Sequence, residues 1–297
     1  MDSKKKATTV VEQIEKLKSR GMIIEDEEKA KEYLLDIGYF RLGFYWFPFE
    51  KTYPRKKNRN HILKDNTNLD YVIKLYYFDF DLRNLFLRYI SRIEINFRTK
   101  LIYYVSNFYK ADPYWYVSSA VIKEKLLTDK EYKKQLSELS REDVVRIDRQ
   151  HHDGCKYSPA WKAIEFMSFG MIIRLYENLK SNHLLCDIAK VYDFNHPSQF
   201  IDYLNALRRL RNYCAHGKVL FDLDLSQAIG GGPLGNLGNN KTNLAGVYFV
   251  LKYLLEKISR NRVVELQASM LEIFEKVPYT VLRDIISNCS GLKKDNL

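Results

Sequence analysis

The stretch Leu207-Arg208-Arg209-Leu210-Arg211-Asn212-Tyr213-Cys214-Ala215-His216-Gly217 carries the clearest structural signal in this sequence of 297 residues. Apolar side chains recur here every three or four residues, as on the buried face of an amphipathic helix. They are Leu204, Leu207, Leu210 and Cys214. The sequence predicts a helix that opens at His196-Pro197 and stops at Gly217, a residue typical of helix C-termini.

Three polar residues near the end of this helix could act on a phosphodiester. His216 carries an imidazole, which moves protons near neutral pH, and Arg211 carries a guanidinium, which holds a phosphate and its developing charge. Asn212 and His216 are four residues apart and share a face. Arg211 lies roughly 140° from His216 around a regular helix, so only its long side chain would reach the same pocket. The alternative is an ordinary helix end, where a histidine interacts favourably with the helix dipole.

Arg211-Asn212-x-x-x-His216 resembles the Arg-x4-6-His motif of the HEPN ribonuclease superfamily. Two further blocks resemble one branch of it, the Abi-like proteins of bacterial phage abortive infection (the AbiD/AbiF type). The first is Asp36-Ile37-Gly38-Tyr39-Phe40-Arg41-Leu42 with Tyr45-Trp46-Phe47-Pro48-Phe49. The second is Pro159-Ala160-Trp161 with Glu165-Phe166-Met167-Ser168-Phe169-Gly170. The three blocks follow one another in the order expected of the family and span most of the chain.

This resemblance implies an all-α, HEPN-like helical bundle that acts as a metal-independent endoribonuclease toxin. Arg211, Asn212 and His216 would be its catalytic residues, and no cofactor is implied. In the family two such motifs meet across a dimer, so the single copy here implies a symmetric homodimer. A ribose 2′-OH would attack its own 3′-phosphate, and an RNA or protein antitoxin would restrain the toxin. The alternative is a non-catalytic RNA-binding or scaffolding protein with the same fold.

The composition bounds the class of protein. Hydrophobic residues make up 46% of the chain and charged residues 29%, which is typical of a soluble protein with a real core. No run approaches the roughly 18 apolar residues of a membrane helix, and the N-terminus lacks the apolar core of a signal peptide. We therefore expect a cytoplasmic protein with no membrane partner. The net charge of +11 favours a polyanionic partner such as RNA.

Apolar periodicity predicts helices throughout, with at most a minor hairpin near 218–240. The longest predicted helix runs from Asp70 to about Tyr109. Shorter helices are predicted over 9–20, 27–37, 39–49, parts of 118–150, 158–180, the segment up to 192, 242–258, 263–277 and 280–287. The polar connector 50–68 is long and basic, and it predicts a boundary between a small helical module, 1–66, and a HEPN-like domain, 67–297.

Other charged residues have two interpretations each. Arg208 and Arg209 either extend an RNA-binding surface or are solvated charges. Arg41 lies among aromatic rings, which suits single-stranded RNA but also suits an interface onto the helical core. The basic connector residues Arg55, Lys56 and Lys57 are further candidates for RNA binding. Glu94, Arg98 and Glu165 either support the active site from behind or form ordinary ion pairs.

Three other patterns carry little functional weight. His151-His152-Asp153 with Cys155 does not predict a metal site, because adjacent histidines point to different sides of a regular element. The four cysteines form no CxxC pair, so neither zinc nor a disulfide framework is expected. The glycine-rich segment 229–240 is neither a Walker loop nor a GxGxxG turn. It is either a flexible cover for the site or a plain connector.

Overall fold

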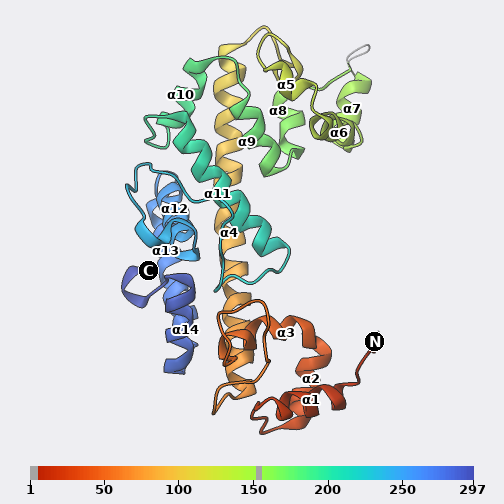
Figure 1. Ribbon diagram of the computed structural model, residues 1–297. Helices are drawn as coiled ribbons and strands as arrows, with labels where there is room; N and C mark the ends of the chain where they lie inside the picture. The colour runs from red at the N-terminus through yellow and green to blue at the C-terminus, as the bar shows by residue number, and fades with distance from the viewer. Residues whose placement is uncertain (1–5, 152–155) are drawn as a thin grey trace. The chain divides into compact units, whose positions relative to one another are not determined.

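The computed structural model describes residues 6–151 and 156–297, and these ranges form an all-α protein, as predicted (Figure 1). Within them no strand is present, only three isolated β-bridges. No helix of the described residues combines the length and the apolar character needed to cross a membrane. The chain divides into two compact units. The first comprises Met1–Asn84, Val219–Asp222 and Ser269–Leu297, and the second Leu85–Lys218 and Leu223–Ala268.

The first unit gathers the two ends of the chain. Its elements are α1 (Val10–Ser19), α2 (Glu27–Asp36), α3 (Tyr39–Trp46), η1 (Phe47–Phe49), the beginning of α4 (Leu69–Phe108), the end of α13 (Arg260–Glu275), α14 (Thr280–Ser290) and η5 (Lys294–Asn296). The helix predicted over 9–20 is present as α1, and a capping box of Thr9 and Glu12 starts it. The predicted division into a module, 1–66, and a domain, 67–297, stays a prediction.

The aromatic block of α3 faces two ways. Tyr45 and Trp46 are buried in the first unit, as an aromatic contact with the core requires. Phe40 and Phe44 point outward, 81% and 48% exposed, with their ring centroids 5.3 Å apart. Arg41 lies on the exposed side as well. The block therefore supplies both core packing and a small exposed aromatic surface beside a cation.

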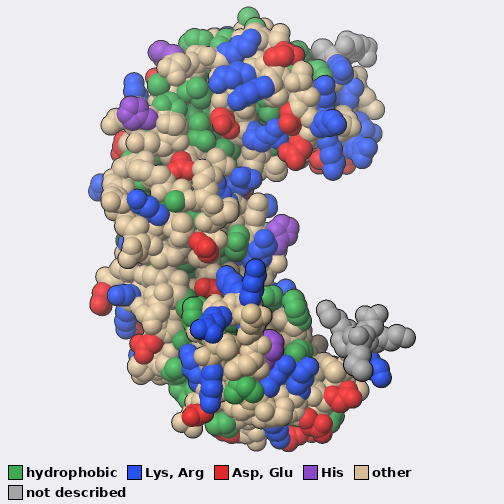
Figure 2. All heavy atoms as spheres, in the orientation of Figure 1, with side chains coloured by type: hydrophobic (Ala, Val, Ile, Leu, Met, Phe, Trp, Pro, Cys, Tyr) green, Lys and Arg blue, Asp and Glu red, His purple; other side chains and the backbone are tan. Residues whose placement is uncertain are grey.

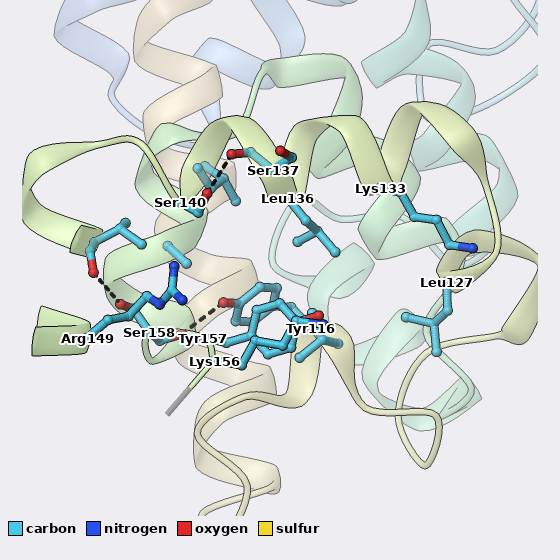
Figure 3. Close-up of a pocket in the computed structure, with 14 residues that line it drawn as sticks. Tyr116, Leu127, Lys133, Leu136, Ser137, Ser140, Arg149, Lys156, Tyr157 and Ser158 are labelled. Atoms are coloured by element: carbon cyan, nitrogen blue, oxygen red, sulfur yellow. Dashed lines mark hydrogen bonds between the residues drawn. The ribbon is translucent and has the colours of Figure 1, made fainter. Parts of the chain in front are cut away.

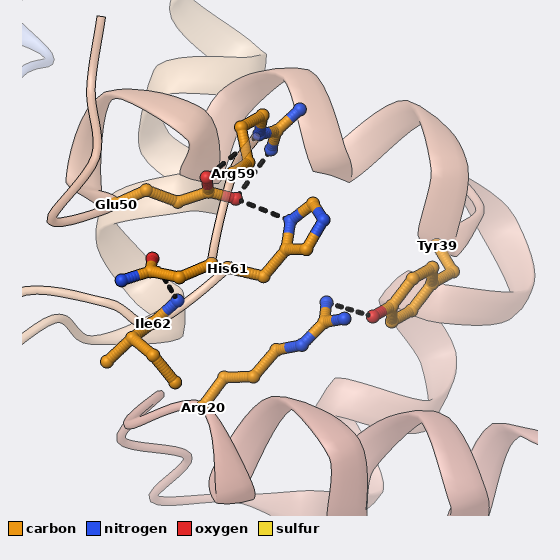
Figure 4. A network of polar contacts seen from close by, with 7 residues as sticks. Arg20, Tyr39, Glu50, Arg59, His61 and Ile62 are labelled. Atoms are coloured by element: carbon orange, nitrogen blue, oxygen red, sulfur yellow. Dashed lines mark hydrogen bonds and ion pairs between the residues drawn. The ribbon is translucent and has the colours of Figure 1, made fainter. Parts of the chain in front are cut away.

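The basic connector is tied into the first unit rather than extended from it (Figure 4). Glu50 is 1% exposed and accepts hydrogen bonds from Arg59 at 2.8 and 2.5 Å, and His61 Nδ1 lies 3.1 Å from it. Burial acts to raise the pKa of Glu50, but the contacts with Arg59 and His61 outweigh it and hold that pKa below its usual value. The basic residues of the connector tip, Arg55, Lys56 and Lys57, remain exposed.

A buried carboxylate holds the segment Val219–Asp222 in the first unit. Both oxygens of Asp79 accept backbone N–H groups, from Leu220 at 2.6 Å and from Phe221 at 2.8 Å. Tyr45 donates its hydroxyl to Asp79 at 3.2 Å, and Arg83 lies 3.7 Å away. Burial raises the pKa of Asp79 to about 7, against these hydrogen bonds and the arginine, which lower it.

The second unit is built around the remainder of α4. It adds η2 (Trp115–Val117), α5 (Glu124–Leu127), α6 (Lys130–Leu139), α7 (Asp143–His151), α8 (Ala160–Ala163), η3 (Ile164–Phe166), α9 (Phe169–Glu177), α10 (Asn182–Lys190), α11 (Pro197–Ala215), η4 (Gly238–Lys241), α12 (Leu244–Glu256) and the start of α13. The predicted apolar stripe of α4 is buried in this unit at Phe86, Ile93, Phe97 and Leu101.

Two local predictions were wrong. The helix expected over 158–180 is interrupted, because Met167 is extended and the Ser168 side chain accepts the Met171 N–H and starts α9. The first helical turn begins at Ala160 rather than at Ser158, which is buried and donates its hydroxyl to the Val145 carbonyl. The minor hairpin considered near 218–240 is also absent from the described chain, where this segment forms loops, turns and the start of η4.

Candidate functional site

The motif lies at the end of α11, as the sequence predicts. The apolar stripe of this helix is buried, with Leu204, Leu207 and Leu210 fully enclosed and Cys214 5% exposed. The helix ends at Ala215, and Gly217 follows with φ +61°, a conformation that favours glycine. Burial of one stripe fixes the rotation of the helix, so it decides which side the polar motif residues occupy.

Arg208, Arg211 and Asn212 line a cavity of about 400 Å³ between α11 and the first turn of α9. Figure 1 shows these two helices side by side in the second unit. Gly170 in that turn gives Arg208 room, because a Cβ there would lie 3.1 Å from the Arg208 Cδ. The lining also includes Arg174 and the carboxylates Glu131 and Glu177, so three arginines face two acids. Arginines and a helix N-terminus are groups that bind phosphate, and the cavity therefore suits an anionic ligand.

The cations of the cavity differ in how far they are neutralised. Arg174 forms ion pairs with Asp129 at 2.9 Å and with Glu131 at 2.8 Å. Arg208 donates a hydrogen bond to the Asn205 side chain at 3.1 Å. Within the described chain, the half-buried guanidinium of Arg211 has neither a hydrogen bond nor an ion pair. The N–H donors of Arg211 are therefore available to a ligand.

His216 does not belong to the lining of this cavity. It is exposed at the C-cap of α11, where its backbone N–H bonds to the Asn212 carbonyl at 3.0 Å. One chain thus places Arg211 and Asn212 together in the cavity and leaves the imidazole at the exposed helix end. The side-chain contact between Arg211 and His216 that the motif suggests stays a prediction.

The three charged residues expected behind the site are connected to each other. Arg98 forms ion pairs with Glu94 at 3.0 Å and with Glu165 at 3.7 Å, and it donates a hydrogen bond to the Met167 carbonyl at 3.1 Å. Met167 directly precedes Ser168, the cap of α9 and a lining residue of the cavity. These three side chains thus join α4 to the start of α9. The sequence had suggested support of the site or ordinary ion pairs, but not this connection.

Arg209, which the sequence grouped with Arg208, has a different environment. Arg209 donates to the Gln227 carbonyl at 3.2 Å and also contacts its side chain, away from the cavity. The glycine-rich segment packs on the first half of α11, where Gly230 bonds to Asp202 and Leu234 to Tyr203. None of its residues lines the cavity, so it serves here as a connector packed on the helix.

The remaining predicted residues are not among those that line this cavity. Arg41, Arg55, Lys56 and Lys57 belong to the first unit. His151 ends α7, whereas His152, Asp153 and Cys155 lie outside the described residues. Among residues 6–151 and 156–297, no three His, Cys, Asp or Glu side chains are grouped as metal ligands. Sequence reasoning missed the contributions of Ser168, Gly170 and Asn205 to the cavity, although the first two stand in a block that it quoted.

The fold and the site define an all-helical protein with a cationic cavity beside its motif helix. The family model of Abi-like proteins matches residues 32–222, well over half of the chain. The chain therefore belongs to the Abi-like protein family, which points to a role in abortive infection. The comparisons with curated proteins and with solved structures gave no match.

Proposed function

We propose that this Abi-like protein is a metal-independent endoribonuclease of the HEPN type, acting as a toxin in phage abortive infection. The observation that carries the proposal is the cavity in which Arg211, with no partner among the described residues, lies beside Asn212 and the first turn of α9. Such a cavity accepts a phosphodiester group. His216, one turn further on, provides the proton-transfer group.

In the proposed reaction the 2′-oxygen of a ribose forms a bond to the adjacent phosphorus, and the bond from phosphorus to the 5′-oxygen breaks. His216 takes the proton of the 2′-OH or gives one to the leaving 5′-oxygen. Arg211 holds the phosphate and offsets the charge that develops on it, and Asn212 orients the phosphate or the imidazole. The products are a 2′,3′-cyclic phosphate and a 5′-OH, so all atoms come from the RNA itself.

The active species in this proposal is a homodimer. His216 is exposed and outside the cavity of its own chain, which leaves it accessible to the motif of a second copy. An isologous contact would bring two motifs together around one axis. The like charges of the two copies oppose that approach, so apolar contacts elsewhere must hold the dimer. An RNA or protein antitoxin would restrain the toxin in the cell.

One observation favours a second candidate, a non-catalytic RNA-binding or scaffolding protein. The same exposure of His216 leaves the cavity of a single chain with cations but without an imidazole. Such a protein would bind RNA with strong salt dependence and would leave it intact. Incubation of labelled RNA with the purified chain separates the two functions directly.

We expect cleavage to continue in excess EDTA and to stop when the substrate carries 2′-deoxyribose at the cleaved position. The nucleophile belongs to the RNA, so no metal-activated water is required. Gel analysis of matched RNA and 2′-deoxy oligonucleotides measures both effects. A metal-dependent ribonuclease, which must stop in the same EDTA, is the control for chelation. Activity lost in EDTA and restored by magnesium, or equal cleavage of the deoxy substrate, would reject the proposed chemistry.

We expect Gly170→Ala to weaken RNA binding by roughly threefold to tenfold, because the new methyl group would lie 3.1 Å from the Arg208 Cδ and this side chain must shift to make room. The free energy of unfolding should change by no more than about 1 kcal/mol. Titration of the chain with a fluorescent RNA measures the first quantity and a melt the second. Gly231→Ala is the control, since a Cβ there meets nothing within 4 Å. If Gly170→Ala binds RNA as tightly as the wild type, Arg208 is not part of the RNA-binding surface.

A further inference from the structure

A second cavity of the same unit lies between η2 and helices α5 to α8 (Figure 3). Its volume is about 530 Å³, within the range of sites that hold small molecules. None of its lining residues takes part in the cavity beside α11. Figure 2 shows Lys and Arg side chains gathered on the surface over α5 to α7.

Three cations and no carboxylate line this cavity in the described chain. The cations are Lys133, Arg149 and Lys156. Figure 3 shows the Arg149 side chain reaching from α7 toward Ser140 and Tyr157. The Arg149 Nε is buried and has no hydrogen-bond partner among the described residues. A buried N–H without an acceptor costs free energy, so an acceptor on a bound anion would satisfy it.

The rest of the lining is apolar and aromatic. Tyr116 is buried and fixed, since its hydroxyl donates to the Ser158 carbonyl at 2.9 Å and its own carbonyl accepts from Tyr132 at 2.6 Å. Tyr157 is only half-buried and packs edge-on against it, with centroids 6.3 Å apart. Leu136 contributes to the wall beside these rings. An aromatic ring next to cations suits a ligand with a flat base and a phosphate.

We propose that this cavity binds a phosphorylated nucleotide. Its phosphate lies against Arg149 and the neighbouring lysines, and its base lies against Tyr157 and Leu136. The same chemistry is offered by a free nucleotide and by the phosphorylated end of an RNA. The proposal does not depend on catalysis at the α11 site, and it gives the second unit a ligand site of its own.

Calorimetric titration of the full chain tests this site with AMP, GMP, CMP and UMP, and with the corresponding nucleosides as the probes without phosphate. We expect at least one nucleotide to bind, and its nucleoside to bind about tenfold or more weakly. Arg149→Gln should weaken nucleotide binding by about tenfold or more. Arg146→Gln, on the same helix but outside the cavity, should leave it unchanged. If Arg149→Gln lowers the melting temperature, Lys133→Gln provides the second test. Lys133 is exposed, and its substitution should also weaken nucleotide binding.

Absence of binding by all four nucleotides at millimolar concentration would overturn the proposal. So would equal affinity for nucleotide and nucleoside, or equal losses in the Arg149 and Arg146 variants. A 5′-phosphorylated dinucleotide with 2′-O-methyl groups, which resists cleavage through the 2′-oxygen, distinguishes the two sources. Tighter binding of the mononucleotide assigns the cavity to free nucleotides, and tighter binding of the dinucleotide assigns it to RNA ends. Either result supports a site for phosphorylated nucleotides.

Discussion

His216→Ala is expected to lower the rate of RNA cleavage by about 10²–10⁴-fold, the usual contribution of a general acid–base group. The side chain is exposed at the end of α11, so its removal should leave the melting temperature unchanged. His196→Ala is the matched control, because His196 is also exposed and lies at the other end of the same helix. Cleavage of labelled RNA and a thermal melt measure the two quantities. A folded His216 variant with full activity would exclude this residue from catalysis.

Arg211→Ala should cause a comparable loss of cleavage, and the two variants together test the dimer. If one site draws on both protomers, a mixture of the Arg211 and His216 variants contains heterodimers with one intact arginine and one intact histidine. We expect this mixture to recover part of the activity that each variant lacks. Sedimentation establishes the oligomeric state beforehand. A fully active monomer would contradict the shared site.

Asp79→Ala is expected to lower the free energy of unfolding by about 3–5 kcal/mol, because each buried donor left without its acceptor costs roughly 1–3 kcal/mol. The substitution leaves the Leu220 and Phe221 N–H groups without their acceptor and leaves Arg83, which is 6% exposed, without its carboxylate. Asp81→Ala is the control, since Asp81 pairs with Lys276 at a more exposed position and should cost less than about 1 kcal/mol.

The unfolding free energy lost in Asp79→Ala should depend on pH. Its pKa is 3.8 in the absence of burial and about 7 in the folded chain. The unfolded carboxyl therefore ionises first, and the stability that Asp79 contributes falls as the pH rises from about 4 to about 7. The difference in unfolding free energy between the wild type and Asp79→Ala should be larger at pH 5 than at pH 8. Denaturant melts at the two pH values measure this difference in unfolding free energy. A difference that is the same at both pH values, or larger at pH 8, would contradict the raised pKa of Asp79.

The local sequence predicted the elements whose apolar periodicity extends over several turns. The stripe of α11 and the stripe of α4 were read correctly because each buries one continuous face, and burial follows the helical repeat. The start of α1 was also predictable, since its capping box involves only near neighbours. The break at Met167 was not, because no proline or glycine marks it and Arg98 binds its carbonyl from a distant helix.

The sequence by itself determined the helical class, the motif and its place at a helix end, and its blocks matched those of the family. Only the tertiary structure brought Arg208, Arg211 and Asn212 beside the start of α9 and left His216 outside that cavity. Only the tertiary structure assembled the cavity around Arg149, whose lining comes from η2, helices α5 to α8 and residues 156–158. Periodicity reports which face of one helix is buried, whereas a pocket depends on which faces of different helices meet, and that is set by packing between residues far apart in the chain.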